Sequence, residues 1–162
     1  MTSVRFANIR TSRKYVRSLR LEPYASAYEL FDQMSSLRVR PIRVVEWPLV
    51  IPGPMGVWIA REEDDIVVVQ EMATGRHRDH ILLHELAHIL CDHEGEPMSG
   101  DGMASLPLLG DESVEPRRLR SVYDSAAERE AELLAAAFAE RLIDDDAEPQ
   151  VAWDMQRYFA GD

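Results

Sequence analysis

The stretch ILLHELAHILCDH, residues 81–93, holds three of the five histidines in the chain. His84 and His88 stand four residues apart, and Glu85 directly follows the first of them, in the order H-E-x-x-H. The remaining positions are mostly apolar, so the segment is predicted to form a buried helix. Such a helix either carries hydrogen-bonded core histidines or supplies two ligands and a base to a metal site.

The spacing of the two histidines suits metal coordination. Residues four apart on an α-helix lie on one face, about 40° apart around its axis. His84 and His88 can therefore direct a ring nitrogen at one point, and zinc accepts imidazole nitrogen as a ligand. Glu85 suits the role of a general base, which takes a proton from the water that the metal activates. This combination on an apolar helix, with strands just upstream, favours a metal site.

A third ligand is expected from a second helix. Extending the motif to H-E-x-x-H-x-x-G-x-x-H fails, because Cys91 stands at the glycine position and Glu94 at the last histidine position. The apolar segment 124–143 is predicted to be helical, and within it Glu128 and Glu132 are four residues apart. One carboxylate is expected to bind zinc, and the other to orient a ligating histidine by a hydrogen bond.

Two further interpretations concern the same helix. The segment Ser125-Ala-Ala-Glu128 fits a helix capping box, which would give Glu128 a structural task instead of a metal. Glu130 lies between the two candidate ligands in sequence and is expected to point elsewhere, into solvent. The sequence leaves the choice between Glu128 and Glu132 open.

The segments around these helices predict an α+β fold with a small sheet. Residues 24–37 are predicted to form a helix, and residues 40–47, 56–60 and 66–70 three strands. The Gly-, Pro- and acid-rich stretch of about 95–122 is predicted to be a long loop. Three parts follow: a basic arm or helix at 1–22, a domain at 23–143, and an amphipathic tail helix at 144–162.

Composition indicates a protein of the cytoplasm. The chain of 162 residues is 29% charged, and it shows neither a secretory signal nor an apolar run of the roughly 18 residues that a membrane helix needs. Its one cysteine, Cys91, excludes an intrachain disulfide. The net charge of −11 argues against direct binding to nucleic acid. The six basic residues at positions 1–20, with no acid among them, are expected to be solvated or to contact an acidic partner.

The two motifs together resemble a known family. HELAH at 84–88, followed by Glu128-Arg-Glu-Ala-Glu132 and Leu-Leu-Ala135, is similar to the paired motifs of the ImmA/IrrE metallopeptidases. The resemblance implies a compact, zincin-like minimal metalloprotease, in which a small sheet packs against the HExxH helix and a second, glutamate-bearing helix. It also implies Zn²⁺ as the cofactor and Glu128 as the third ligand. Glu132 departs from the family, where asparagine or aspartate is usual, and Leu134 replaces its aromatic residue.

The resemblance also implies a function. Members of the family act in the bacterial cytoplasm, where they cleave or otherwise remove a helix-turn-helix repressor and so derepress genes. The chain is therefore expected to be a zinc-dependent endopeptidase with such a regulator as substrate or partner. One alternative is a non-catalytic zinc-fold module that binds a transcription factor or antitoxin. Another is a small-molecule metallohydrolase, although the upstream strand suits a peptide better.

The other candidate residues have open roles. Tyr123 and His93 follow from sequence proximity as possible oxyanion donors, and each is also explained by a structural or solvated position. His80 precedes His84 by one turn and either extends the metal face or is solvated, and His77 is expected to be solvated or capping. Cys91 is expected to be a buried thiol, with a redox sensor beside the metal as the alternative.

Overall fold

The computed structural model describes residues 5–97 and 119–143, which form helices on one side of a mixed sheet. In chain order the elements are α1 (Ile9–Ser18), α2 (Ala27–Arg38), β1 (Ile42–Trp47), β2 (Gly56–Ala60), β3 (Asp65–Gln70), α3 (Gly75–Cys91), β4 (Glu96–Pro97), β5 (Leu119–Val122) and α5 (Ser125–Ala139). The predicted α+β class is confirmed. The predicted tail helix at 144–162 lies outside the described residues.

The sheet has the strand order β1-β3-β2-β5-β4. β1 runs parallel to β3, and all the other neighbours pair antiparallel. The three predicted strands form its centre and one edge, and β3 is buried along its whole length, as its unbroken apolar run requires. The short strands β5 and β4 extend the sheet.

The predicted loop at 95–122 differs from the structure at both ends. Residues 96–97 and 119–122 are strands, because their backbone groups pair with each other and with the open edge of β2. Strands of two and four residues are too short to carry an alternating pattern, so their sequence gave no signal. The interior of that stretch lies outside the described residues.

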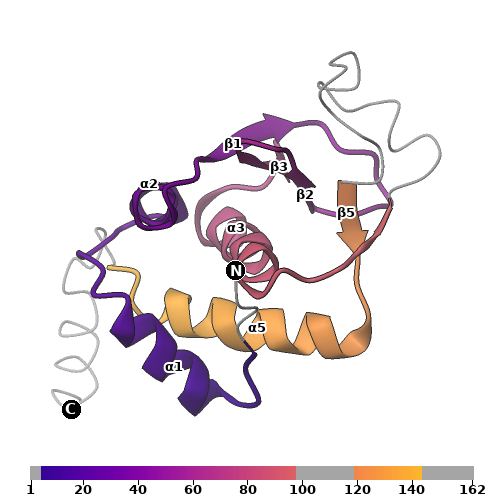
Figure 1. Ribbon diagram of the computed structural model, residues 1–162. Helices are drawn as coiled ribbons and strands as arrows, with labels where there is room; N and C mark the ends of the chain where they lie inside the picture. The colour runs from indigo at the N-terminus through magenta and orange to yellow at the C-terminus, as the bar shows by residue number, and fades with distance from the viewer. Residues whose placement is uncertain (1–4, 98–118, 144–162) are drawn as a thin grey trace, which may run out of the picture.

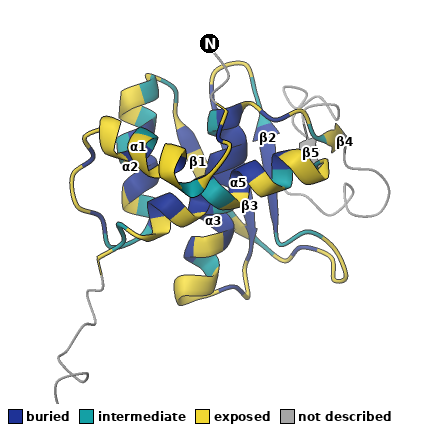
Figure 2. Cartoon of the chain, turned by 90° about the horizontal axis from the view of Figure 1, so that it is seen from below, coloured by how far each residue is buried: buried dark blue, intermediate teal, exposed yellow. Residues whose placement is uncertain are grey.

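The helix α3 lies at the centre of the fold, between the sheet above it and α5 below it (Figure 1). Its buried residues occur all around its circumference, and Leu82, Leu83 and Leu86 have no exposed surface. α1 packs against α5, and α2 packs beside β1. Figure 2 shows the resulting concentration of buried residues in the middle of the molecule. The position of α3 therefore explains why its sequence is apolar on nearly every side.

The N-terminal basic segment contains a packed helix. Asn8 caps α1, and Ser12 and Val16 on its inner face are buried. All six basic residues of this segment are exposed, in agreement with the prediction of a solvated basic face. On that face Arg13 donates to both carboxylate oxygens of Glu140 in α5. Within residues 5–97 and 119–143, no helix has the length and hydropathy that a membrane crossing requires.

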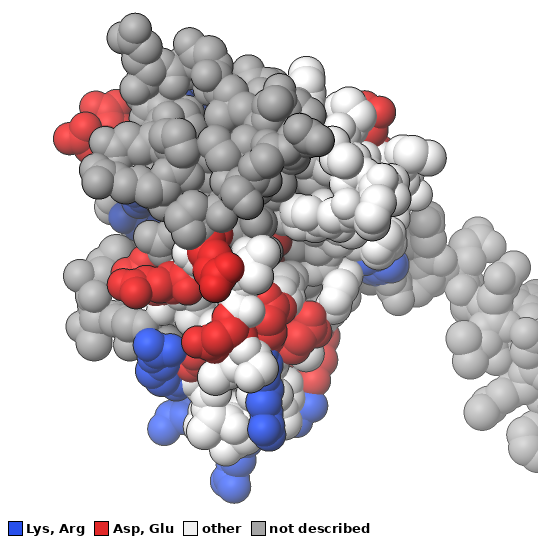
Figure 3. Space-filling model, turned by 90° about the vertical axis from the view of Figure 1, so that its right-hand side faces the viewer, with Lys and Arg blue, Asp and Glu red and all other residues white. Residues whose placement is uncertain are grey.

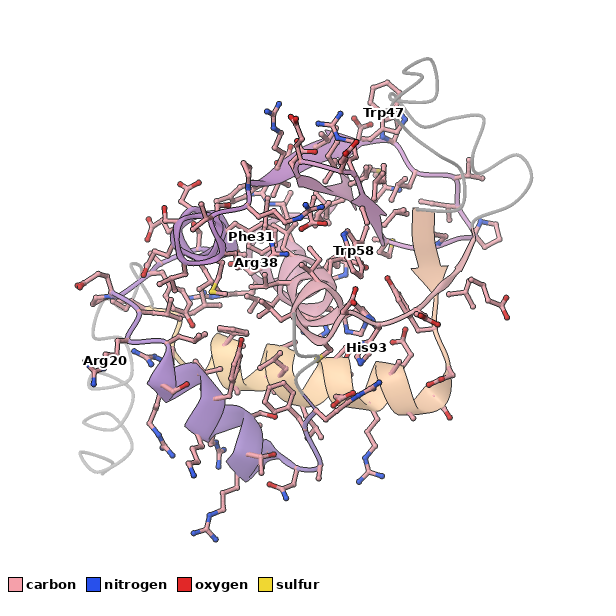
Figure 4. The ribbon with its side chains drawn as sticks, in the orientation of Figure 1. Arg20, Phe31, Arg38, Trp47, Trp58 and His93 are labelled. Carbon is pink, nitrogen blue, oxygen red and sulfur yellow. The ribbon has the colours of Figure 1, made fainter. Side chains whose placement is uncertain are left out.

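A buried carboxylate ties α2 to the sheet. Asp65, at the start of β3, is 1% exposed and accepts hydrogen bonds from Trp58 Nε1 at 3.0 Å and Arg38 Nη2 at 2.9 Å. Arg40 Nε donates to the same carboxylate at 3.0 Å. Figure 4 shows Arg38 and Trp58 approaching this region from α2 and β2. These bonds fix the sheet beside α3, where the candidate site lies.

Candidate metal centre

Two histidines and a glutamate converge between α3 and α5. His84 Nε2 lies 2.9 Å from His88 Nε2 and 3.1 Å from Glu128 Oε2. His88 Nε2 lies 3.5 Å from Glu128 Oε1, and one ligand atom from each residue falls within 4.8 Å of the other two. The cluster that the sequence predicted is thus present, and of the two candidate carboxylates it is Glu128 that joins it.

The start of α5 explains why Glu128 is available. Asp124 is the N-cap residue, and its side chain accepts from Ala127 N at 2.7 Å. The alternative of a capping box at Ser125 and Glu128 is therefore wrong, because the helix begins one residue earlier than that pattern requires. Glu128 falls in the first turn beyond the cap, on the side of α5 that packs along α3. Its carboxylate has no capping task.

Glu85 is buried against β2. It is 6% exposed, and its Oε2 atom has no hydrogen-bond partner among the residues that the structure describes. Burial, and then the nearby charge of Glu128, raise the pKa of Glu85 to about 8. Gly56 permits the close approach, since a methyl group there would lie 2.8 Å from Glu85 Oε1 and 2.9 Å from Ile81 Cγ2. A carboxyl group with such a pKa can both take and return a proton near neutral pH.

His88 is held neutral. It is fully buried, and burial together with the neighbouring rings of His84 and His93 lowers its pKa to about 2. The ring of Tyr123 stacks on it with centroids 3.6 Å apart and planes 11° apart. A neutral imidazole keeps a lone pair for a metal ion. Tyr123, which the sequence suggested as a possible oxyanion donor, thus covers one face of the His88 ring. It also lines a pocket beside the cluster.

A pocket of about 340 Å³ opens beside these groups. Its lining comes from the start of β2 and the segment before it, from α3, from the residue after β5 and from α5, and consists of Pro54, Met55, Gly56, His77, His80, Ile81, His84, Glu85, Tyr123, Glu128 and Glu132. Figure 3 views the side of the molecule where β5 and the start of α5 lie, and acidic side chains gather across its middle. The pocket and its surroundings therefore favour a cation.

Glu132 lies beside the cluster without joining it. Its Oε1 atom is 2.8 Å from His84 Nδ1, although the two are not aligned for a hydrogen bond, and 3.8 Å from His80 Nε2. The structure thus places Glu132 next to His84, a candidate ligand, but without the hydrogen bond expected of an orienting carboxylate. The side chain of His80 is 57% exposed, which agrees with a solvated position.

His93 has a buried, structural position, which the sequence allowed as the alternative to an oxyanion donor. The left-handed conformation of Asp92 ends α3 and turns His93 back against His88, 2.9 Å away between Nδ1 atoms. Figure 4 shows His93 between α3 and α5. His93 is 3% exposed and engages both ring nitrogens, so the oxyanion role considered for it is not supported.

The prediction that Glu130 is solvated is wrong. Glu130 is 7% exposed and lies 2.9 Å from His93 Nε2. A sequence signal for this existed: Ala127, Glu130, Leu134 and Phe138 recur at helical spacing, and this stripe faces the core. The prediction failed because α5 packs against α1 as well as α3, so that a position beside the metal-facing side is also covered.

Cys91 is a buried thiol outside any disulfide, as the sequence predicted. Burial, and then the charge of Glu130, raise its pKa to about 12. The thiol is therefore protonated at neutral pH, which disfavours a redox role, since the thiolate is the reactive form.

The donor set fits a divalent metal ion. Two imidazole nitrogens and a carboxylate are the ligands of many catalytic zinc sites. A buried carboxylate oxygen without a partner lies on the adjoining residue, Glu85. The residues present can therefore bind a divalent cation at the wall of an open pocket.

No protein-family model, curated protein or solved structure matches this chain in comparisons with known proteins.

Proposed function

We propose that the chain is a zinc-dependent endopeptidase with a zincin-like arrangement, of the kind that its resemblance to the ImmA/IrrE metallopeptidases implies. The observation that carries the proposal is the convergence of His84, His88 and Glu128, from two helices, next to the buried carboxylate of Glu85. The substrate we propose is a helix-turn-helix transcriptional regulator, whose cleavage or inactivation would derepress genes in the cytoplasm.

His84, His88 and Glu128 would hold the metal. Bound there, zinc would supply Lewis-acid polarisation of the scissile carbonyl and of the attacking water. Glu85 would take a proton from the attacking water and pass it to the departing amine, because its carboxyl group lines the pocket beside the candidate ligands. The Oε2 atom of Glu85 has no hydrogen-bond partner among the described residues, so it is available for this proton transfer.

The end of β2 offers a place for an extended peptide. β5 pairs with β2 at Trp58 and Ile59, and its next residues, Ser121 and Val122, follow beside Val57 and Gly56 without a pairing in the described structure. Gly56 also lines the pocket. A peptide that adds a strand here would run past Glu85, with its backbone held by hydrogen bonds.

The test uses the zinc-loaded full chain and its Glu85→Gln variant. Each is incubated with a peptide library and with the helix-turn-helix regulator encoded next to its gene, and new fragment ends are sought by mass spectrometry. We expect the wild type to cut and Glu85→Gln to bind zinc without cutting. Equal cleavage by the variant would overturn the proposed role of Glu85. A stable complex with the regulator and no cleavage would support the docking module instead.

A further inference from the structure

A chain of buried polar contacts runs from the candidate metal ligands to the N-terminal segment. His88 Nδ1 lies 2.9 Å from His93 Nδ1, and His93 Nε2 lies 2.9 Å from Glu130 Oε2. Glu130 in turn accepts from the backbone N–H of Phe6 and, at 3.2 Å, from Arg5 Nη1. His88, His93 and Glu130 are all buried, so water does not compete for these bonds.

The proton positions in this chain follow from the metal ligand. If His88 presents the lone pair of Nε2 to a metal, its single proton must be on Nδ1. His88 Nδ1–H then donates to His93 Nδ1, which must be an acceptor. The proton of a neutral His93 is consequently on Nε2 and is donated to Glu130. The opposite direction would put a proton on His88 Nε2 and block metal binding.

Glu130 sets this direction because a carboxylate only accepts. Both carboxylate oxygens already accept hydrogen bonds from other groups, Oε1 from the backbone N–H of Phe6 and Oε2 from the guanidinium of Arg5, as expected for an ionised carboxylate. Since it has no proton to donate, the Nε2 atom of His93 must carry one.

We propose that His93 and Glu130 are positioning residues that fix His88 as its Nδ1–H tautomer, and that Arg5 and Phe6 complete this network from the N-terminal segment. The inference rests on the proposed metal-binding role of His88. The proposal extends the site from three ligands to a buried network. That network reaches Phe6, which lies 124 residues before Glu130 in the sequence.

A second metal site is the competing explanation of the same residues. Cys91, His93 and Glu130 also bring three ligand atoms within 4.8 Å of one another. However, both nitrogens of His93 already have partners, at His88 and Glu130. The relay accounts for the contacts of both ring nitrogens of His93 without any rearrangement, so it explains these residues better than a second metal site does.

The first test observes the tautomer directly. Imidazole ¹⁵N NMR of the metal-free, full-length protein should show the His88 proton on Nδ1. Zinc should then bind with one equivalent and leave that proton in place. A wild-type spectrum with the proton on His88 Nε2 would overturn the proposal, and two tightly bound zinc equivalents would support the second metal site instead.

The second test uses Glu130→Gln with Glu140→Gln as its control. A glutamine has the shape of glutamate but also carries N–H donors, so the network can reverse. We expect a mixture of His88 tautomers and a zinc affinity about 10-fold lower or more, measured by chelator competition. Glu140 is likewise paired with an N-terminal arginine, Arg13, but on the surface, so Glu140→Gln should change neither quantity. An unchanged tautomer and affinity in Glu130→Gln would refute the relay.

The contribution of the N-terminal segment can be separated from packing. Proline at position 6 removes the N–H that Glu130 accepts, whereas Phe6→Ala removes the buried ring and keeps that N–H. We expect Phe6→Pro to weaken zinc binding more than Phe6→Ala does, with the larger change in His88 tautomer. Equal zinc affinities and tautomers in the two variants would remove the segment from the network. These measurements need no cleavage: a chain that binds zinc and shows the relay without cutting contradicts only the proposed peptidase activity.

Discussion

At Glu85, burial of the side chain and ionisation of its carboxyl group are in conflict. Its carboxyl group is almost inaccessible and its Oε2 atom has no hydrogen-bond partner among the described residues, so ionisation is costly. A residue that served packing alone would be apolar at this position. The cost of keeping a carboxyl group here therefore supports a chemical role for it, as buried, perturbed acids cluster at functional sites.

This conflict predicts a pH-dependent effect of Glu85→Gln on stability. The pKa of Glu85 is about 8 in the folded chain against an ordinary 4.5, so the folded state binds its proton more tightly than the unfolded state does. The contribution of Glu85 to stability is therefore present at low pH and is lost as the pH rises from 4.5 toward 8. In the metal-free protein, Glu85→Gln should be more stable than the wild type at about pH 9, by more than about 1 kcal/mol.

Urea unfolding with a chelator, at about pH 5 and about pH 9, measures this difference. The gap between the two proteins should narrow at the lower pH, where the wild-type carboxyl group is protonated. Because all other groups titrate in both proteins, the comparison isolates Glu85. A gap that is equal at both pH values would show that Glu85 is ionised throughout.

Glu128 and Glu132 should differ sharply as metal ligands. Glu128 lies within 3.5 Å of both histidine Nε2 atoms, whereas Glu132 approaches only the far nitrogen of His84. We expect Glu128→Gln to lower zinc affinity by more than 100-fold and Glu132→Gln by about 10- to 100-fold, since outer groups typically contribute that much. Chelator competition on the two variants decides this, and the reverse ranking would make Glu132 the ligand.

At the scale of the elements, the contact between β2 and α3 depends on one glycine. A methyl group on Gly56 would overlap Glu85 and Ile81 at less than 3 Å, so Gly56→Ala should push the Glu85 carboxyl group toward the pocket. Since burial is the main cause of its raised pKa, we expect that pKa to fall toward 4.5. Side-chain ¹³C NMR titration of the metal-free protein measures the change.

Gly75→Ala is the matched control. Gly75 begins α3 with φ of 53°, and no atom lies within 4 Å of a methyl group added there. This substitution strains the backbone and should lower stability by about 1 kcal/mol. It should leave the pKa of Glu85 unchanged. If both substitutions shifted that pKa equally, the effect would come from general loosening of α3.

The sequence predicted those features of the elements that depend on local periodicity. His84 and His88 had to share a helical face, and the same spacing in α5 gave Glu128 and Glu132 as candidate ligands without deciding between them. The stripe of Ala127, Glu130, Leu134 and Phe138 indicated that Glu130 is buried, but which elements cover it depends on how α1 and α3 pack against α5. The sequence also missed β4 and β5, whose pairing is made by backbone groups of distant segments. What the sequence missed therefore depends on contacts between segments that are distant in the chain.

At the scale of the whole molecule, the site joins two halves of the fold. α3 is fixed to the sheet on one side, while α5 packs below it and contacts α1 (Figure 1). The candidate ligands come from both helices, so a bound metal would link α5 to α3. Metal binding should therefore stabilise the layer formed by α5 and α1 more than the strands on the opposite side of α3.

Metal removal tests this coupling. Free zinc at 100 times its dissociation constant should add about 2.7 kcal/mol to the free energy of unfolding, which a chelator reverses. Hydrogen exchange should show the largest loss of protection in α5 and in the N-terminal segment through α1. Arg5 in that segment donates to Glu130 of α5. β1 and β3 pair along six residues each and should lose less. An equal loss of protection in the sheet and the helices would mean that the metal stabilises the fold as a whole and not α5 and α1 in particular. No change in protection or in unfolding free energy would mean that this cluster holds no metal.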